Sequence, residues 1–300
     1  MKLSNRALLH FDTIRRCGSI RQAARQLHLS SSALNRQLLA IEAQIGFPLF
    51  ERLVSGLRLT PAGEVMARHA IHVMQDEQRM CAEMLALRGL QAGHVDLFTV
   101  EALTHSFVPT VIDKMAERHP RVTFRIGIGG SQYAASRVVE GAADVAIGFI
   151  HERNVNLKQI AVAPFTLGIA VTPDHPLAHL QSVRFSQCMR FPMVLPEPGL
   201  TLRAALVPLL AAQAEPPEVV LETASFELMR QIALRGRALV FINQFGIESD
   251  LSARRLVHIP LKDAAPSHLG IYVRARRSLP PAVSAFCERA AETLKALATA

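Results

Sequence analysis

The spacing of the apolar residues changes once along the chain, near residue 95. Before that point apolar residues recur at helical spacing, and after it strand-length apolar runs alternate with helical patterns. Consecutive amphipathic helices indicate a helical domain, whereas strand–helix alternation is typical of parallel sheets flanked by helices. The 300 residues suffice for two or three domains. The sequence therefore predicts a helical N-terminal part followed by an α/β part.

Three short amphipathic helices are predicted in the first 46 residues. Their apolar stripes are Leu8, Phe11 and Ile14, then Ile20, Ala23, Ala24 and Leu27, and finally Leu34, Leu38, Ile41 and Ile45. Ser19 is placed to cap the second helix and Ser30 or Ser31 the third, which Gly46 ends.

The third helix has a polar face opposite its apolar stripe. That face holds Ser32, Asn35 and Arg36, flanked by Ser31 and Gln37. A helix-turn-helix protein places such a helix in the major groove of DNA. There Arg suits guanine, Asn and Gln suit adenine, and Ser suits either base or phosphate. A helical hairpin with a merely hydrated outer face fits this pattern about equally well.

The positive charge of the chain is concentrated at the N-terminus. Residues 1–60 hold nine Lys and Arg residues and three acidic ones, a net charge of 9 − 3 = +6 out of +8 for the whole chain. This asymmetry indicates one domain that meets a polyanion. A solvated basic surface would carry the same charge, so charge alone leaves both interpretations open.

A hairpin is predicted after the third helix. Residues 47–60, FPLFERLVSGLRLT, read as two short strands around Ser55-Gly56. Three helices followed by a hairpin make a winged helix, and Arg52 on the wing is placed to enter a minor groove.

Four motifs now follow one another in the first 63 residues. They are AAxxLHxS (Ala23 to Ser30), ALxRQ (Ala33 to Gln37), G-x-PLFER (Gly46 to Arg52) and LTPAG (Leu59 to Gly63). In these motifs and their spacing the chain resembles the LysR-type transcriptional regulators. The similarity is strong over residues 1–63 and looser afterwards.

The resemblance implies a winged helix-turn-helix DNA-binding domain in residues 1–60. The family usually has Gln-Pro where this chain has Ser31-Ser32, and Ser in place of Asn35. These departures lie on the exposed face, so they affect the operator sequence and not the fold. The predicted DNA contacts are Ser30, Ser31, Ser32, Ala33, Asn35, Arg36, Gln37 and Arg52.

A long helix is predicted after the wing, in residues 61–90. Thr60-Pro61 is a strong helix start, and a seam in 4-3 spacing follows, namely Met66, Ala70, Val73, Glu77, Met80, Met84 and Leu87. The alternative is a helix packed on its own chain. The resemblance implies a dimerising linker helix, and tetramers through further contacts. His69 and His72 lack a third ligand in the sequence, so no metal site is predicted.

The α/β part is predicted to span residues 91–300. Its strands are 95–100, 122–129, 144–149, 166–171, 190–195, 218–223, 238–242 and 271–275, with helices near 105–118, 131–140, 200–213 and 225–235. An amphipathic tail carries Val283, Phe286, Ala290, Leu294 and Leu297. The resemblance implies two subdomains of periplasmic-binding-protein type, residues 91–162 with 268–300 and residues 163–267, linked by crossover strands near 160–166 and 267–273.

A small-molecule effector is expected between these subdomains. In such folds a ligand sits beyond the carboxyl ends of the strands, where helix N-termini present N–H groups. Gly129, Pro198 and Phe226 lie at strand ends as well and are candidates for the same reason. The predicted contacts are Glu101, Thr104, His105, Ser106, Gly130, Ser131, Gln132, Gly148, Phe149, Gly199, Leu200, Thr201, Thr223, Ser225, Asn243 and Gln244. Few of them are basic, which favours a small polar or anionic metabolite held by N–H and hydroxyl groups.

Other functional classes find little support in the sequence. It contains no GxSxG, Walker, HExxH or CxxC motif, and its four cysteines are scattered. No export signal or membrane-length apolar run is present, which predicts a cytoplasmic protein. Three hypotheses remain: a ligand-responsive transcription factor, which we favour; an architectural DNA-binding protein; and an enzyme or solute-binding protein. The first needs no cofactor or membrane, and its partners would be double-stranded DNA, an effector, further copies of the chain and RNA polymerase.

Overall fold

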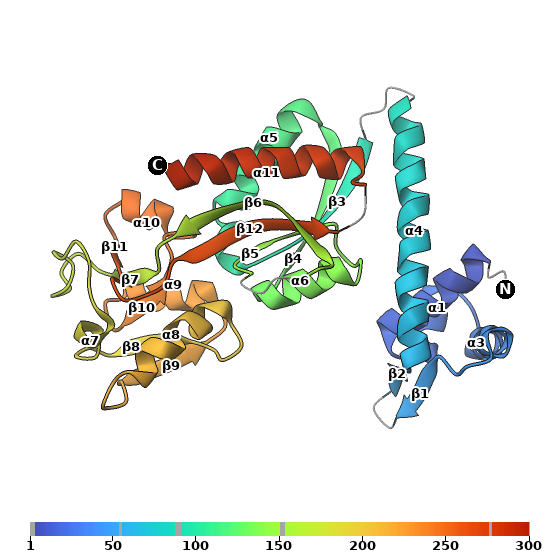
Figure 1. Cartoon of the computed structure of the whole chain (residues 1–300), viewed down its shortest axis with the longest axis horizontal. Helices are drawn as coiled ribbons and strands as arrows, with labels where there is room; N and C mark the ends of the chain where they lie inside the picture. Colours follow the sequence, from blue (N-terminus) through green and yellow to red (C-terminus); the bar gives the residue numbers. More distant parts are fainter. Residues whose placement is uncertain (1–3, 54–55, 88–91, 151–153, 276–277, 300) are drawn as a thin grey trace. The chain divides into compact units, whose positions relative to one another are not determined.

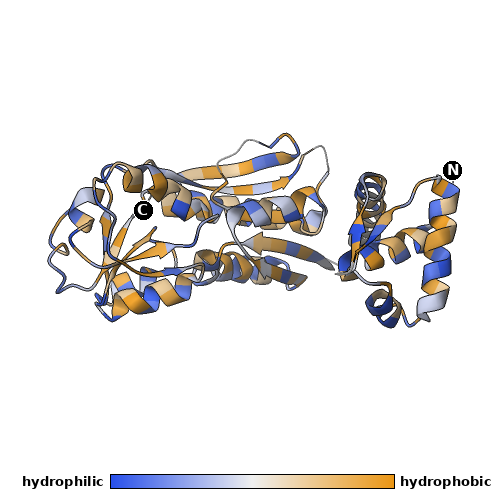
Figure 2. Cartoon of the chain, turned by 90° about the horizontal axis from the view of Figure 1, so that it is seen from below, coloured by the Kyte–Doolittle hydropathy of each residue, from blue (hydrophilic) through white to orange (hydrophobic). Residues whose placement is uncertain are grey.

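The computed structural model describes residues 4–53, 56–87, 92–150, 154–275 and 278–299 (Figure 1). The chain divides into two compact units, one that runs to Leu90 and one that takes in Gln91–Val139 and Ala143–Ala300. Figure 2 shows strands of the second unit that are mainly apolar, while its helices carry both apolar and polar residues. This pattern is expected of sheets buried between helices.

The first unit is a winged helix-turn-helix followed by a long helix, which confirms the predicted fold. Its elements are α1 (Asn5–Cys17), α2 (Ile20–Gln26), α3 (Ser31–Ile45), β1 (Phe50–Leu53), β2 (Gly56–Leu59) and α4 (Pro61–Leu87). The two strands pair antiparallel as the wing. Ser30 caps α3 by accepting a hydrogen bond from the Ala33 N–H at 3.2 Å, and Gly46 ends it with φ 85°. Gly46 adopts the left-handed conformation that glycine favours.

Local contacts join these elements into one core. Phe11 of α1, Leu34 of α3 and Leu49 before the wing are fully buried together. The Glu42 carboxylate accepts a hydrogen bond from the Leu49 N–H at 2.7 Å, which anchors α3 to the start of the wing. Gly63 at the start of α4 has no room for a side chain, because a Cβ there would overlap the Leu49 carbonyl oxygen. This close approach explains the glycine of the LTPAG motif.

The predicted seam of α4 divides into two halves. Met66 and Ala70 are buried in the core of the first unit, and Val73 packs against that core. The alternative of a helix packed on its own chain therefore holds for this half, which corrects the single continuous seam. Met80 and Met84 are 56% and 61% exposed. Leu87 and His72 have side chains outside those that the structure describes.

The second unit contains two five-stranded sheets. The first has the order β4-β3-β5-β12-β6, with β3 (Ala92–Thr99), β4 (Arg121–Ile128), β5 (Val145–Gly148), β6 (Leu157–Phe165) and β12 (Ser267–Arg274). The second has the order β11-β7-β10-β8-β9, with β7 (Gly168–Val171), β8 (Met193–Pro196), β9 (Val219–Thr223), β10 (Leu239–Ile242) and β11 (Val257–Pro260).

Both sheets are mixed, although strand–helix alternation predicted parallel ones. Three strands in each sheet are parallel, β4-β3-β5 and β9-β8-β10. In the first sheet β12 runs antiparallel to β5 and β6, and in the second β7 runs antiparallel to β10 and β11. The reversals arise where the chain crosses between the sheets, which alternation of elements does not encode. The sequence prediction missed β11.

Helices cover both faces of each sheet (Figure 1). On the first sheet, α5 (Phe107–Arg118) and α11 (Pro281–Thr299) cover one face and α6 (Ser131–Val139) the other. On the second, α7 (Phe185–Cys188) and α8 (Thr201–Ala211) cover one face, and α9 (Phe226–Leu234) and α10 (Glu248–Ser252) the other. The single-turn helix η1 (Glu101–Thr104) follows β3. This layering leaves the strand ends and helix N-termini to form a site.

Candidate functional site

The outer face of α3 presents side chains that can reach DNA. Ser31, Ser32 and Arg36 are exposed, and Asn35 is half-buried. Arg36 has a long cationic side chain and suits a guanine edge or a phosphate. Ser30 is engaged at the helix start, where its hydroxyl caps Ala33 and lies 3.2 Å from the Ser32 hydroxyl.

The wing contacts this same face. The Arg52 guanidinium donates a hydrogen bond from Nη2 to Oδ1 of Asn35 at 3.1 Å, and Arg52 is otherwise exposed. Asn35 thus has one of its hydrogen-bonding atoms occupied by a residue of the same chain. Two predicted DNA contacts from separate elements are brought together here.

Gln37 is oriented differently from the other predicted contacts. Its amide oxygen is buried beside His10, at an open hollow of about 270 Å³ between α1 and α3. Burial and the charge of Arg6 lower the pKa of His10. In this conformation Gln37 packs between the two helices and is not presented on the outer face.

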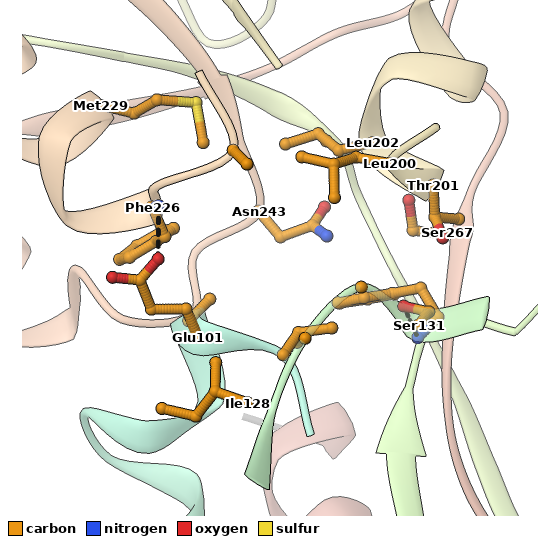
Figure 3. Close-up of a pocket in the computed structure, with 16 residues that line it drawn as sticks. Glu101, Ile128, Ser131, Leu200, Thr201, Leu202, Phe226, Met229, Asn243 and Ser267 are labelled. Carbon is orange, nitrogen blue, oxygen red and sulfur yellow. Dashed lines mark hydrogen bonds between the residues drawn. The ribbon is translucent and has the colours of Figure 1, made fainter. Parts of the chain in front are cut away.

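The second unit holds a cavity of about 220 Å³ at the ends of strands from both sheets (Figure 3). Its walls are mainly apolar, with a few polar groups. The lining residues are Val100, Glu101, Ala102, Ile128, Gly129, Gly130, Ser131, Phe149, Leu200, Thr201, Leu202, Ala224, Phe226, Met229, Asn243 and Ser267.

Seven of the predicted effector contacts line this cavity, namely Glu101, Gly130, Ser131, Phe149, Leu200, Thr201 and Asn243. The lining residues outside the prediction are chiefly apolar, namely Val100, Ala102, Ile128, Gly129, Leu202, Ala224, Phe226, Met229 and Ser267. The prediction took the residues that follow each strand, so it did not reach apolar residues further into the helices, such as Leu202 and Met229. Gly129 and Phe226, which the sequence placed at strand ends, are among these lining residues, whereas Pro198 is not.

The other predicted contacts lie outside the cavity lining. These are Thr104, His105, Ser106, Gln132, Gly148, Gly199, Thr223, Ser225 and Gln244. Ser225 caps α9 by accepting from the Leu228 N–H at 3.2 Å, and the Thr223 hydroxyl accepts from the Ser225 N–H at 3.1 Å. Thr104 donates to the Glu101 carbonyl at 2.7 Å. Helix and turn capping accounts for these three.

Glu101 joins the two halves of the second unit. Its carboxylate follows β3 of the first sheet and accepts hydrogen bonds from the N–H groups of Phe226, at 2.7 Å, and Glu227, at 3.4 Å. Both donors begin α9 on the second sheet, so Glu101 supplies a negative charge to the positive end of that helix. Figure 3 shows this contact on the cavity wall.

Two residues close to Glu101 in the chain also contact residues of the second sheet's helices. The Ser106 hydroxyl donates to Oε1 of Glu248 at 2.6 Å, next to α10. The His105 ring packs edge-on against Phe226, with Nε2 3.4 Å from a Glu227 carboxylate oxygen. A hydrogen bond from Gln231 lowers the pKa of Glu227. Glu101, His105 and Ser106, which we call the clasp, hold the two subdomains together in this conformation.

An ion cluster around the buried Asp250 lies next to the clasp. Asp250 is fully buried and receives hydrogen bonds from Arg230, with Nη2 to Oδ1 at 3.0 Å, and an ion pair from Arg255. Arg230 also contacts Glu227 at 3.0 Å. The chain Glu227–Arg230–Asp250 thereby fixes α9 to α10.

The polar atoms that face the cavity are only partly satisfied. The Oδ1 atom of Asn243 is buried and has no hydrogen-bond partner among the described residues. Ser131 accepts from the Phe149 N–H at 3.0 Å through Oγ, so its hydroxyl proton is left to donate. An unpaired buried acceptor is costly unless a ligand or water fills the site.

The described cysteine side chains do not assemble into a reactive site. Burial raises the pKa of Cys188 and of Cys287 to about 12, so both stay protonated thiols. Cys17 is a half-buried free thiol.

Within residues whose side chains are described, no group of three or more His, Cys, Asp and Glu could hold a metal ion. Among the same residues, no helix is long and apolar enough to cross a membrane.

Two family models match the chain over most of its length. Residues 5–64 match the bacterial regulatory helix-turn-helix protein of the lysR family, and residues 88–295 match the LysR substrate binding domain. The chain belongs to the LysR family. It is a LysR-type transcriptional regulator with a helix-turn-helix domain and an effector-binding domain.

Known LysR proteins resemble the chain along nearly its whole length. The RuBisCO operon transcriptional regulator of Allochromatium vinosum is 26% identical over 291 residues, which cover 96% of this chain and 95% of the relative. A full-length OxyR variant from Pseudomonas aeruginosa matches with a TM-score of 0.72 at 17% identity, covering 97% of this chain and 95% of that one. Full-length CbnR in complex with its target DNA matches with a TM-score of 0.62 at 17% identity, covering 97% and 100%. The two structural likenesses establish the fold.

Proposed function

We propose that this LysR-type regulator binds a two-fold operator through α3 and the wing, and that a small molecule in the cavity between the two sheets controls its activity. The observation that carries the proposal is the cavity itself. It lies at the carboxyl ends of strands from both sheets, where α/β proteins bind ligands. A DNA-binding unit joined to a ligand-sized cavity gives a means of coupling metabolite level to transcription.

The clasp supplies the coupling in this proposal. Glu101, His105 and Ser106 bridge the subdomains on one side of the cavity. A ligand that contacts both subdomains favours one angle between them over another, and a change of that angle is passed to neighbouring copies. The ligand shifts the equilibrium only by its differential affinity for the two arrangements.

Self-association through the second half of α4 completes the proposal. Two-fold operators are read by two-fold proteins, and exposed Met80 and Met84 provide an apolar surface in the right spacing. Tetramers would follow from further contacts between α/β units. Contact with RNA polymerase belongs to the same proposal, as does an effector whose identity is suggested by the genes next to this one.

The experiment is footprinting of the full-length protein on the promoters that flank its own gene, with and without metabolites of the neighbouring pathway. One operator with two-fold symmetry and an effector-dependent change in its protected length is expected. Ser131→Ala lies in the cavity and Thr104→Val outside it, so the first should weaken the effector response and the second should not. Equal responses in both variants would remove the cavity from the proposal.

A further inference from the structure

The Asn243 side chain is the most informative polar group of the cavity. It is 9% exposed, it lines the cavity, and its Oδ1 atom has no partner among the described residues. Figure 3 shows its amide projecting between the two walls. Asn243 follows β10, which is buried on both faces, so the backbone holds this acceptor in place. A ligand that satisfies Oδ1 must bring an N–H or O–H donor.

The charge at the cavity favours the same kind of donor. Glu101 is the one charged residue among the described lining residues, and no Lys, Arg or His accompanies it. Its carboxylate already accepts from α9, but a carboxylate has further lone pairs to offer. A cationic donor bound to the unpaired Asn243 oxygen also gains from the negative charge that Glu101 gives the cavity.

A second set of polar groups in the cavity can donate hydrogen bonds, whereas Asn243 Oδ1 and the Glu101 carboxylate accept them. Residues at the starts of α6 and α8 line the cavity, and these helices have nine and eleven residues. The cap residue of α8 is Leu200, which makes no side-chain cap hydrogen bond. Helix N-termini present free N–H groups and a partial positive charge. Ser131 and Thr201, at the starts of these two helices, line the same cavity (Figure 3).

Apolar residues make up most of the rest of the cavity wall. Val100, Ile128, Leu202 and Met229 are among the lining residues, together with Phe149 and Phe226. Such walls stabilise an apolar body by removing its surface from water. A dicarboxylate or a sugar would leave them without a partner.

We propose that the effector is a small zwitterion with an apolar body, of the type of an apolar amino acid. Its ammonium group binds Asn243 Oδ1 and is attracted by the negative charge of Glu101 in the same cavity. Its carboxylate binds the N-termini of α6 and α8 with the Ser131 and Thr201 hydroxyls, and its side chain fills the apolar part of the cavity. This inference rests on the proposed function and names the ligand class of that same site.

Matched ligands test the proposal on the full-length protein by titration calorimetry. Leucine is compared with isoamylamine and 4-methylpentanoate, and phenylalanine with phenethylamine and hydrocinnamate; each amine lacks the carboxylate and each acid lacks the ammonium group. At least one amino acid should bind, and its amine and its acid should each bind roughly tenfold or more weakly. An acid that binds as tightly as its amino acid overturns the ammonium site, and an equally tight amine overturns the carboxylate site. Failure of all apolar amino acids to bind overturns the class.

Variants of one amide test where the ammonium group binds. Asn243→Leu should abolish amino-acid binding, whereas Asn243→Asp keeps an acceptor oxygen and should keep binding. Gln244→Ala is the matched control, because Gln244 is the neighbouring amide, exposed and outside the cavity. Thermal unfolding of each variant identifies any that fails to fold. Amino-acid binding that survives in folded Asn243→Leu, or is lost in folded Asn243→Asp, overturns the assignment.

Operator footprints separate this inference from the function on which it rests. If a ligand of another class binds in the cavity and changes the footprint, the ligand class is wrong and the proposed function stands. If an apolar amino acid binds in an Asn243-dependent way and the footprint does not change, the ligand class stands and effector control is wrong.

Discussion

Arg52 of the wing donates a hydrogen bond to Asn35 of α3, with Nη2 and Oδ1 3.1 Å apart. The two residues are 17 positions apart and lie on different elements. This contact ties the wing to the recognition face in the absence of DNA. To place Arg52 in a minor groove and Asn35 against a base edge, the protein must exchange this hydrogen bond for contacts with DNA.

Arg36→Ala should relax the preference at one base pair of each half-site. Arg36 is exposed on the outer face of α3, where a bidentate contact to guanine is worth about 1–3 kcal/mol. Binding measured across a randomised site library checks this. A uniform loss of affinity with unaltered base preference would show that Arg36 contacts phosphate instead.

Arg52→Ala should weaken binding mainly at operators with A·T-rich flanks, whose narrow minor groove attracts arginine. The slope of log affinity against log salt should become shallower by about 0.9 if Arg52 neutralises one phosphate. Gel-shift titrations at several salt concentrations on A·T-rich and G·C-rich flanks measure both effects. Equal losses on the two flanks would place Arg52 outside the minor groove.

Met80→Glu combined with Met84→Glu should dissociate the dimer that we propose for α4. Both residues are exposed within one chain, and pairing would bury the new charges without partners, which is costly. Val65→Glu is the control, since Val65 is 60% exposed on the same helix but outside the 4-3 spacing. Sedimentation velocity distinguishes monomer from dimer. A double variant that sediments and binds DNA like the parent would rule out this seam.

Met66→Ala should behave differently from those seam variants. Met66 is buried in the core of the first unit, so its truncation should reduce unfolding stability by about 2–5 kcal/mol. Denaturant unfolding measures the loss. A stable Met66→Ala protein that is defective only in dimerisation would contradict the division of the helix into two halves.

The free energy of unfolding should decrease as the pH falls below about 6.5. Burial lowers the pKa of His258 from 6.5, and the pKa values of His10 and His175 are shifted in the same direction. Between the folded and unfolded pKa values the unfolded chain binds more protons, so acid favours unfolding there, and the effect levels off below the folded pKa. His258→Gln keeps a donor for the Ile242 carbonyl, which lies 3.1 Å from Nε2, and should show a shallower decline. Unfolding curves from pH 7.5 to 5 test it, and an unchanged slope would refute the contribution of His258.

Asp250→Asn should destabilise the second unit strongly. Asp250 is fully buried between Arg230 and Arg255, and removal of one charge from such a cluster costs about 3–5 kcal/mol. Thermal unfolding of Asp250→Asn is compared with that of Glu222→Gln. The second variant breaks the more exposed ion pair with Arg203 and should lose little stability. A similar loss of stability in the two variants would mean that the ion pairs of Asp250 stabilise the fold no more than an exposed pair does.

Much of the first unit follows from sequence because its signals are local. Ser30 caps α3 three residues away at Ala33, and Gly46 ends the same helix one residue after it. Such interactions depend on neighbours in the chain, so a one-dimensional pattern contains them. Strands such as β10 are predicted for a related reason, since an unbroken apolar run is stable only when both faces are buried.

The other features depend on contacts between distant residues. Met66 and Met80 occupy equivalent positions in the spacing of α4, yet only the first is covered, because α1 and α3 fold against that end of the helix. β11 is short and ends at Pro260, and it becomes a strand by pairing with β7, almost ninety positions earlier. Its own residues carry a weak strand signal.

The cavity shows the same limit most clearly. Glu101 caps a helix 125 positions away, a partnership that no spacing rule contains. Apolar residues such as Met229 and Leu202 have the pattern of core residues, and whether they face protein or an open cavity depends on how two sheets meet. Local propensity sets where helices and strands form, because it acts over a few residues. The shape and the unpaired acceptor of the cavity arise from packing across the whole unit, where the long-range contacts are made.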